Sequence, residues 1–357
     1  MNRVAVIVVV FLIIVSSVMT LAARETKSVS LDAKVGQLFM IGFRGLEVED
    51  DFQIVRDIAS GRVGGVILFD YDVALDSPVR NIKSPEQVRE LVSTLKEYTQ
   101  IPLFVAIDQE GGKVSRLKEK FGFPEAVSQG YLGEEDNPRL TRFYASRTAG
   151  TLAELGINVN LAPVLDLNVN PESPAIGALD RSFSADPEVV IRNAEIVIEE
   201  LNKRGIMSCL KHFPGHGSSA GDSHEGITDV SGTWREIELE PYREIVRDGY
   251  ADSIMTAHIF NYNWDTEYPA TLSEEVITGM LREDIGFDGL VFSDDMNMGA
   301  IRKEYSLEET IERAINAGAD VLIFANNLTY DEMIAVKAVD IVKKLIEEGR
   351  ITESRID

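Results

Sequence analysis

Eight short apolar runs, spaced along the chain and separated by amphipathic stretches, restrict the possible fold more than any other feature of this sequence. The runs are rich in β-branched residues and are unbroken rather than alternating. Strands of a parallel sheet that is buried on both faces have this pattern. The runs are Gly36–Gly42, Val63–Phe69, Leu103–Ile107, Val159–Leu165, Met207–Lys211, Ser253–His258, Leu290–Ser293 and Val321–Phe324. The pattern therefore predicts eight parallel strands.

Helical segments are expected between most of these runs. Ser84, Asn137 and Asp186 each precede a proline, as N-cap residues often do. Glycines follow several of the segments and are typical helix ends. The segments begin at Ser84 or span residues 137–156, 186–205, 241–250, 273–285, 307–317 and 331–348, with Gly286, Gly318 and Gly349 as stops. The alternation predicts an α/β protein, namely one (β/α)8 TIM-like catalytic barrel over residues 28–357. The alternative is a doubly wound open sheet, but no glycine-rich dinucleotide fingerprint follows the first run.

Both ends of the chain carry their own signals. Asn2–Arg3 supplies positive charge, Val4–Val18 is almost entirely apolar, and small residues follow up to Ala23. Residues 1–23 are thus predicted to be a signal peptide, which implies a secreted or periplasmic protein. An uncleaved N-terminal membrane anchor is the alternative, because the apolar segment is long. Residues 349–357 resemble a turn and the start of another helix, so we expect either a frayed tail or a chain truncated before a C-terminal domain.

The charge of the chain excludes one class of partner. Its net charge is −24, from 59 acidic and 35 basic residues. Such a surface repels phosphate backbones, so we expect no nucleic-acid partner. The one cysteine, Cys209, lies in an apolar run, where we expect a buried and unreactive thiol.

Carboxylates, histidines and basic side chains follow the ends of the predicted strands, where the active site of such a barrel lies. All four histidines, namely His212, His216, His224 and His258, occupy these positions. The sequence contains no serine in a nucleophile elbow and no P-loop. Carboxylate nucleophiles suit glycosyl transfer, because a negative oxygen stabilises an oxocarbenium-like centre. The residues therefore favour glycoside chemistry with a carbohydrate substrate and without a cofactor.

A metal site is the competing interpretation of the histidines. His212 and His216 are four residues apart, and Asp222 and His224 follow closely. Phe213–Pro214–Gly215 separates the first two, so the segment is a loop and lacks the helical spacing of a zinc pair. Lys211 would also place a positive charge beside the ion. We therefore expect no metal.

Two motifs carry a resemblance to a known family. Lys211–Gly217 (KHFPGHG) followed by Asp222–Ser223–His224 resembles glycoside hydrolase family 3, and more narrowly its β-N-acetylglucosaminidase (NagZ-like) branch. Weaker supporting segments occur in family order, namely Ile107–Gly112 with Arg116, Arg181–Phe183, Tyr268–Ser273 and Ser293–Met296. The resemblance spans residues 31–357. It implies a (β/α)8 barrel and a retaining mechanism that removes terminal β-linked N-acetylglucosamine from peptidoglycan fragments or chitooligosaccharides.

The resemblance also assigns roles to individual residues. Asp294 matches the nucleophile, His224 the acid/base on a mobile loop after the fifth strand, and Asp222 the carboxylate that partners it. Asp108 matches the residue that grips sugar hydroxyls far from the scissile bond. The remaining sugar-binding set is Arg116, Arg181, Lys211 and His212. Histidine suits the acid/base role because its pKa of about 6.5 lets it give and take a proton near neutrality.

Several alternatives and departures remain open at this stage. Asp295 could be the nucleophile in place of Asp294, and we expect Lys211 to lower the pKa of Asp294. His216 and His258 are expected to be structural. Departures from the family pattern occur at Ser218–Ser219, in the spacing of Ile176–Gly177 from Arg181, and in an apparent insertion at Asp70–Val79.

Other activities also fit the sequence. Phosphorolysis is one, because a neutral histidine would not repel phosphate. β-Glucosidase or β-xylosidase activity of the same family is another, and a sugar-binding, wall-associated protein without catalysis is the non-enzymatic alternative.

Overall fold

Eight parallel strands close into a barrel in the computed structural model, which describes residues 29–356. The hydrogen-bonded order around the barrel is β1-β12-β11-β9-β7-β6-β3-β2, and β1 closes it by pairing with both β2 and β12. The strands are β1 (Phe39–Gly42), β2 (Gly65–Leu68), β3 (Phe104–Ile107), β6 (Val159–Asn160), β7 (Met207–Phe213), β9 (Ser253–Thr256), β11 (Leu290–Asp295) and β12 (Val321–Phe324). The predicted (β/α)8 barrel is confirmed, and each apolar run supplies one strand.

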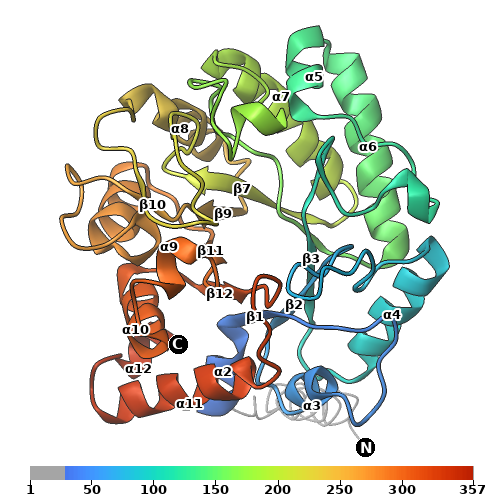
Figure 1. Cartoon of the computed structure of the whole chain (residues 1–357), viewed down its shortest axis with the longest axis vertical. Coiled ribbons are helices and arrows are strands. Elements are labelled where there is room, and N and C mark those ends of the chain that lie inside the picture. The colour runs from blue at the N-terminus through green and yellow to red at the C-terminus, as the bar shows by residue number, and fades with distance from the viewer. Residues whose placement is uncertain (1–28, 357) are drawn as a thin grey trace, which may run out of the picture. The chain divides into compact units, whose positions relative to one another are not determined.

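Helices surround these strands (Figure 1). The α-helices are α2 (Leu31–Gln37), α3 (Gln53–Ala59), α4 (Pro85–Glu97), α5 (Gln129–Glu135), α6 (Pro138–Leu155), α7 (Pro187–Asn202), α8 (Glu240–Arg247), α9 (Gly299–Arg302), α10 (Leu307–Ala317), α11 (Ile334–Glu347) and α12 (Glu353–Ile356). A π-helix, η5 (Glu275–Asp284), occupies the segment predicted at 273–285, and 3-10 turns lie at η1 (Glu119–Phe121), η2 (Gly177–Leu179), η3 (Glu236–Leu239) and η4 (Ala270–Leu272).

The predicted helix starts are confirmed by their caps. The side chains of Ser84, Asn137 and Asp186 each accept a hydrogen bond from a backbone N–H in the first turn of the helix that follows. Each of these bonds satisfies one of the donors that a helix start leaves unpaired. At the other ends, Gly286 and Gly318 adopt positive φ angles of 80° and 118°, which glycine tolerates without steric cost.

Two strand boundaries differ from the prediction by three residues or more. Gly36 belongs to α2 rather than to the first strand, and a Cβ at this position would lie 1.8 Å from the carbonyl oxygen of Gly61. The glycine therefore marks a close helix–loop contact. The fourth strand ends at Asn160 rather than Leu165. Pro163 has no N–H for a ladder, and beyond the strand only an isolated bridge joins Val164 to Lys211.

The interior of the barrel is filled by apolar side chains from all eight strands or the residues directly after them. The cluster comprises Met40, Ile67, Phe69, Ala106, Val159, Leu161, Cys209, Met255, Phe292, Val321, Ile323 and Ala325. Cys209 is fully buried, as expected, and burial raises the pKa of its thiol to about 12. This core seals the barrel, so a substrate is confined to the carboxyl ends of the strands.

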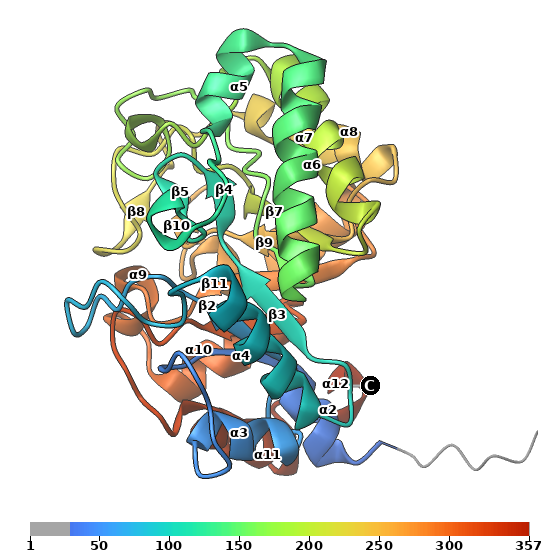
Figure 2. The same cartoon turned by 90° about the vertical axis from the view of Figure 1, so that its right-hand side faces the viewer.

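Two small sheets lie beyond these carboxyl ends. One joins β4 (Gln109–Gly111) to β5 (Val114–Ser115), and the other joins β8 (Thr228–Asp229) to β10 (Ile259–Phe260). Figure 2 shows β5, β8 and β10 on one side of the barrel, together with α9. The two small sheets border the site described below.

The described C-terminal residues are held against the barrel rather than frayed. Ile351 and Ile356 are buried, and Arg355 donates hydrogen bonds to the carbonyls of Ile315 and Ala319. Within residues 29–356, no helix combines the length and apolar character needed to cross a membrane. The predicted signal peptide or anchor at residues 1–23 lies outside the described residues.

Candidate active site

A cavity of about 300 Å³ lies at the carboxyl ends of the barrel strands. Seven of the eight predicted site residues line it, and they lie at the ends of four strands or in the loops that follow them. They are Asp108, Arg116, Arg181, Lys211, His212, His224 and Asp294. The eighth, Asp222, is hydrogen-bonded to His224. Apolar side chains such as Ile67, Leu161 and Met255 form the floor, where the cavity meets the core.

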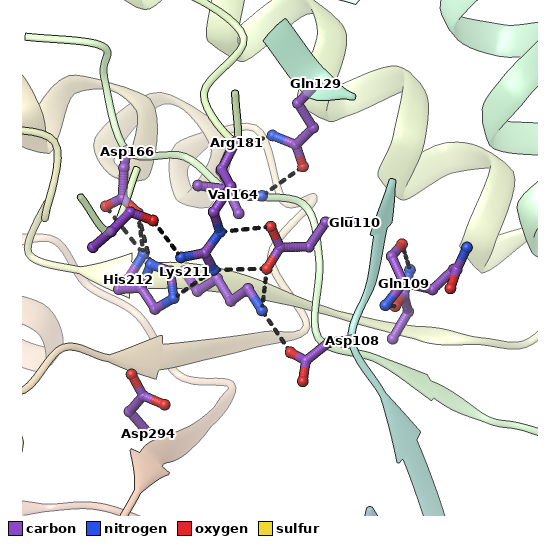
Figure 3. Close-up of polar contacts among 12 residues, drawn as sticks. Asp108, Gln109, Glu110, Gln129, Val164, Asp166, Arg181, Lys211, His212 and Asp294 are labelled. Carbon is purple, nitrogen blue, oxygen red and sulfur yellow. Dashed lines mark hydrogen bonds and ion pairs between the residues drawn. The ribbon is translucent and has the colours of Figure 1, made fainter. Parts of the chain in front are cut away.

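A cluster of four buried charges forms one wall of the cavity (Figure 3). Lys211 Nζ lies 2.8 Å from Asp108 Oδ1 and 2.7 Å from Glu110 Oε1. Arg181 grips Glu110 with two hydrogen bonds, Nε to Oε2 at 2.8 Å and Nη2 to Oε1 at 2.7 Å. Burial opposes ionisation of Asp108 and Glu110, but the cations hold the pKa of both carboxyls below their ordinary values. The wall therefore stays charged at neutral pH and presents fixed donors and acceptors to a polar ligand.

Arg116 is attached to the same wall from the turn directly after β5. Its Nη2 donates to Asp108 Oδ2 at 3.2 Å, and its guanidinium lies 5.3 Å from the centre of the Phe69 ring. The side chain of Gln109 holds this turn in place by accepting the backbone N–H groups of Arg116 and Leu117. The Nε of Arg116 is buried without a hydrogen-bond partner among the described residues.

His212 is oriented by a buried carboxylate that follows β6. Its Nδ1 donates to Asp166 Oδ2 at 2.6 Å, and its Nε2 accepts from Arg181 Nη2 at 3.3 Å. These contacts hold the ring in one orientation. Asp166 also accepts the backbone N–H groups of His212 and His216, so it organises the whole KHFPGHG turn.

Asp294 and Asp295 follow one another at the end of β11 but have different surroundings. Asp295 Oδ1 accepts the backbone N–H groups of Ala325 and Asn297 at 2.9 and 3.0 Å. Burial raises its pKa to about 6 despite these bonds. Within residues 29–356, the Asp294 side chain accepts one hydrogen bond, from the N–H of Asp295. Burial also opposes ionisation of Asp294, but His258, His212 and His224 hold its pKa below the ordinary value. Asp294 is therefore the more acidic of the two carboxyls and the one with fewer backbone hydrogen bonds.

The pKa of Asp294 is lowered as expected, but Lys211 is not among the leading causes. The ammonium group is bound by Asp108 and Glu110 instead, and Figure 3 shows Asp294 apart from that cluster. The neighbouring histidines supply the stabilisation that was assigned to the lysine.

His224 and Asp222 form a hydrogen-bonded pair on the loop after β7. His224 Nδ1 donates to Asp222 Oδ1 at 2.7 Å, and the same oxygen accepts the His224 backbone N–H at 2.9 Å. The bond with the imidazole lowers the pKa of Asp222 to about 2. Partial burial opposes protonation of His224, but the bond to Asp222 and the charge of Asp294 raise its pKa. The pair can therefore give and take a proton through the free Nε2.

The other two histidines have structural contacts. His216 Nδ1 is hydrogen-bonded to Ser219 Oγ at 2.8 Å, and burial lowers its pKa to about 4. His258 is hydrogen-bonded to Thr271 Oγ1 and donates to the carbonyl of Asp295 at 3.0 Å. Neither residue is among the described residues that line the cavity. Ser219 belongs to one of the departures from the family pattern, and its hydroxyl group anchors the His216 ring.

The other two departures are resolved by the same cavity. Arg181 reaches the cavity despite its unusual spacing, because its guanidinium is anchored by Glu110 and by the carbonyl of Ala175. The insertion at 70–79 forms a turn through an Asp72–Ser77 bridge, and its Val73 lines the cavity. The insertion therefore contributes to one wall.

Sequence reasoning missed Glu110 and Asp166 as site residues. Both follow a predicted strand, so the positional signal that selected Asp108 and Asp294 also applied to them. Their partners, Arg181 and His212, lie 71 and 46 residues away in the chain. In the described part of the chain, no group of three or more His, Cys, Asp or Glu side chains could hold a metal ion.

Comparisons with known proteins agree on one family. The family model described as "Glycosyl hydrolase family 3 N terminal domain" matches residues 30–357. A β-hexosaminidase from Tolumonas auensis is 36% identical over 294 residues, which cover 81% of this chain and 82% of that protein. Two solved structures also match. A family 3 β-N-acetylglucosaminidase from Paenibacillus sp. str. FPU-7 is 36% identical with a TM-score of 0.83, over 92% of this chain and 60% of that one. A β-N-acetylhexosaminidase from Beutenbergia cavernae is 27% identical with a TM-score of 0.81, over 92% of this chain and 96% of that one.

Proposed function

Because the chain belongs to glycosyl hydrolase family 3 and is a glycoside hydrolase, we propose that it is a retaining exo-β-N-acetylglucosaminidase. The substrate class is peptidoglycan fragments or chitooligosaccharides with a terminal, non-reducing β-linked N-acetylglucosamine. The names of the similar proteins, β-hexosaminidase and β-N-acetylglucosaminidase, support this choice. The observation that carries the proposal is that two reactive groups share one cavity. They are the ionised carboxylate of Asp294, which pairs with no lysine or arginine among residues 29–356, and the imidazole of His224, which is hydrogen-bonded to Asp222.

In the first step, an Asp294 oxygen attacks the anomeric carbon and forms a covalent glycosyl ester. The bond between that carbon and the leaving oxygen breaks, and His224 donates its Nε2 proton to the leaving oxygen. In the second step, water attacks the anomeric carbon, His224 takes a proton from it, and Asp294 is released. Asp222 stabilises the imidazolium before the first step and after the second, as a buried carboxylate does for a catalytic histidine elsewhere. Two displacements at one carbon retain its configuration.

The remaining cavity residues bind the sugar in this proposal. Asp108, Lys211 and Arg181 carry charged donors and acceptors that are already fixed by one another or by Glu110, so little conformational entropy is lost when hydroxyl groups bind them. Arg116 is held beside Asp108, and His212 is held in one orientation by Asp166.

Asp294→Asn tests the nucleophile. The variant should turn over an aryl β-N-acetylglucosaminide at less than about a thousandth of the wild-type rate, because the attacking oxygen becomes an amide. A fluorinated substrate analogue should trap the glycosyl ester on the wild-type enzyme, and peptide mapping should place the label on Asp294. A label on Asp295, or near-normal turnover by the variant, would contradict the assignment.

The same preparation tests the reaction type and specificity. Adding inorganic phosphate distinguishes hydrolysis from phosphorolysis, since only phosphorolysis yields sugar 1-phosphate. A panel of aryl glycosides distinguishes N-acetylglucosaminides from glucosides and xylosides. Ligand binding without turnover would identify a sugar-binding protein instead.

An extracytoplasmic location is also proposed, on the composition of residues 1–23. N-terminal sequencing of the protein from its native cell separates the two forms. A start near residue 24 indicates a cleaved signal peptide, and a start at Met1 in the membrane fraction indicates an anchor. A start at Met1 in the cytoplasmic fraction would refute the proposed location.

A further inference from the structure

The loop that carries His224 is docked onto the segment that follows the strand of Asp294. Gly299 N donates to the carbonyl of His224, and Ala300 N donates to the carbonyl of Ser223, both at 3.1 Å. Lys303 Nζ donates to the carbonyl of Glu225 at 2.6 Å. Three consecutive carbonyls of the loop, at 223, 224 and 225, are therefore held by one turn of chain at 299–303.

Two of these contacts use backbone N–H groups at the start of a helix. The first N–H groups of a helix have no partner inside it, and here α9 uses those of Gly299 and Ala300 on the loop. α9 begins four residues after Asp295, the last residue of β11. The segment therefore links the loop directly to the strand end that positions Asp294.

Gly299 allows this close contact through its missing side chain. A Cβ at this position would lie 2.7 Å from the carbonyl oxygen of His224 and 2.8 Å from the carbonyl group of Glu225. Both are backbone atoms, so a side chain here must displace the loop rather than rotate a neighbour. Gly299 does not have a positive φ. The neighbouring loop therefore requires a residue without a side chain at position 299, whereas the backbone conformation of that residue does not.

The loop has a second attachment on its other side. Ser223 is buried, and its Oγ lies 3.3 Å from His216 Nε2. His224 itself is 54% exposed, so packing around its ring does little to fix the imidazole. The backbone attachments at 223–225, together with the hydrogen bond between Nδ1 and Asp222, therefore determine where the ring lies.

We propose that Gly299 and Lys303 are positioning residues for the acid/base, which hold the backbone of His224 so that its imidazole faces the bond that Asp294 attacks. This inference rests on the proposed function, because it assigns a mechanical role toward His224. Because α9 starts four residues after β11, it connects the loop of His224 to the strand end that carries Asp294. Displacement of the loop would therefore move the proton donor relative to the nucleophile.

Gly299→Ala tests the proposal, with Gly226→Ala as the matched control. Gly226 lies two residues from His224 in the same loop, its φ is not positive, and a Cβ there would meet nothing within 4 Å. Two substrates are compared by kcat/KM, which reports the step in which the leaving group departs. A dinitrophenyl β-N-acetylglucosaminide departs without a proton, whereas chitobiose needs one.

Gly299→Ala should lower kcat/KM for chitobiose by about tenfold or more, because it weakens general acid catalysis, whose complete loss costs roughly 10²- to 10⁴-fold. It should lower kcat/KM for the dinitrophenyl substrate much less. Gly226→Ala should leave both values unchanged. Lys303→Met should show the same selectivity as Gly299→Ala with a smaller loss, and Lys303→Arg should restore activity toward chitobiose. Lys303→Met keeps the test decisive if Gly299→Ala does not fold.

Equal losses for the two substrates in both variants, or losses in Gly226→Ala as large as in Gly299→Ala, would overturn the proposal. His224→Ala separates this failure from a failure of the proposed function. If His224→Ala is selective for chitobiose but Gly299→Ala and Lys303→Met are not, the acid role stands and the positioning role is refuted. If His224→Ala is itself unselective, the acid role of His224 is refuted.

Discussion

Glu110→Gln removes one charge from the buried wall of the cavity. Glu110 receives two hydrogen bonds from Arg181 and contacts Lys211, all at 2.7 to 2.8 Å. Its side chain is 1% exposed, and those of Arg181 and Lys211 are 11% and 2% exposed. In the wild type, Arg181 pairs with Glu110, and Lys211 pairs with both Glu110 and Asp108. After the substitution, Arg181 has no carboxylate partner among residues 29–356, and only Asp108 remains beside Lys211.

The expected cost follows from these contacts. Removing one partner of a buried ion pair typically destabilises a protein by about 3–5 kcal/mol. Glutamine has the same shape and keeps one acceptor oxygen, but its amide group turns a donor toward a cation. We therefore expect a loss of about 3 kcal/mol in the free energy of unfolding, together with weaker substrate binding.

Urea denaturation at pH 7 measures this loss, and Glu134→Gln is the control because Glu134 is exposed on α5. The pKa of Glu110 is lowered in the folded protein, so its contribution is complete above its unfolded value of about 4.3. It is lost as the pH falls through the folded pKa. The difference between wild type and Glu110→Gln should therefore shrink only in acid. A loss under about 1 kcal/mol at pH 7, similar to that of the control, would refute the reasoning.

Two further predictions concern pH. Asp222→Asn should lower the pKa of His224, because the hydrogen bond to Asp222 helps to raise it, and the alkaline limb of the pH profile of kcat/KM should move to lower pH; an unchanged limb would contradict the pairing. Glu238 is fully buried and burial raises its pKa to about 7, so the native state binds its proton more tightly than the unfolded chain and stability falls as the pH rises from about 4.5 through 7. Glu238→Gln should remove this dependence, on the order of 3 kcal/mol between pH 5 and pH 8, and parallel urea titration curves of the two proteins would contradict it.

The fold was predictable because its signals are local. An unbroken β-branched run indicates a doubly buried strand wherever it occurs, and Ser84, Asn137 and Asp186 cap helices through residues two or three positions away. The end of the fourth strand was missed because Pro163 interrupts the ladder without interrupting the apolar pattern.

The site was predictable in part. Strand ends selected the correct rim, and the family resemblance assigned the roles, which remain proposals. Glu110 was missed because its importance comes from burial beside Arg181, and no local pattern reports a contact across 71 residues. The docking of residues 223–225 onto 299–303 was missed for the same reason, since glycines next to helices are common and only the neighbouring backbone shows why Gly299 must be one.

The distribution of cations in the cavity distinguishes the carboxylates from one another. Lys211 and Arg181 are bound by Asp108 and Glu110, and His212 is bound by Asp166. Asp294 forms no ion pair with a lysine or arginine among residues 29–356. A carboxylate oxygen engaged by an ammonium or guanidinium group must break that contact before it can attack carbon, whereas Asp294 need not. In the proposed mechanism, the wall of paired charges therefore binds and orients the sugar, and it also occupies the cations that would otherwise weaken Asp294 as a nucleophile.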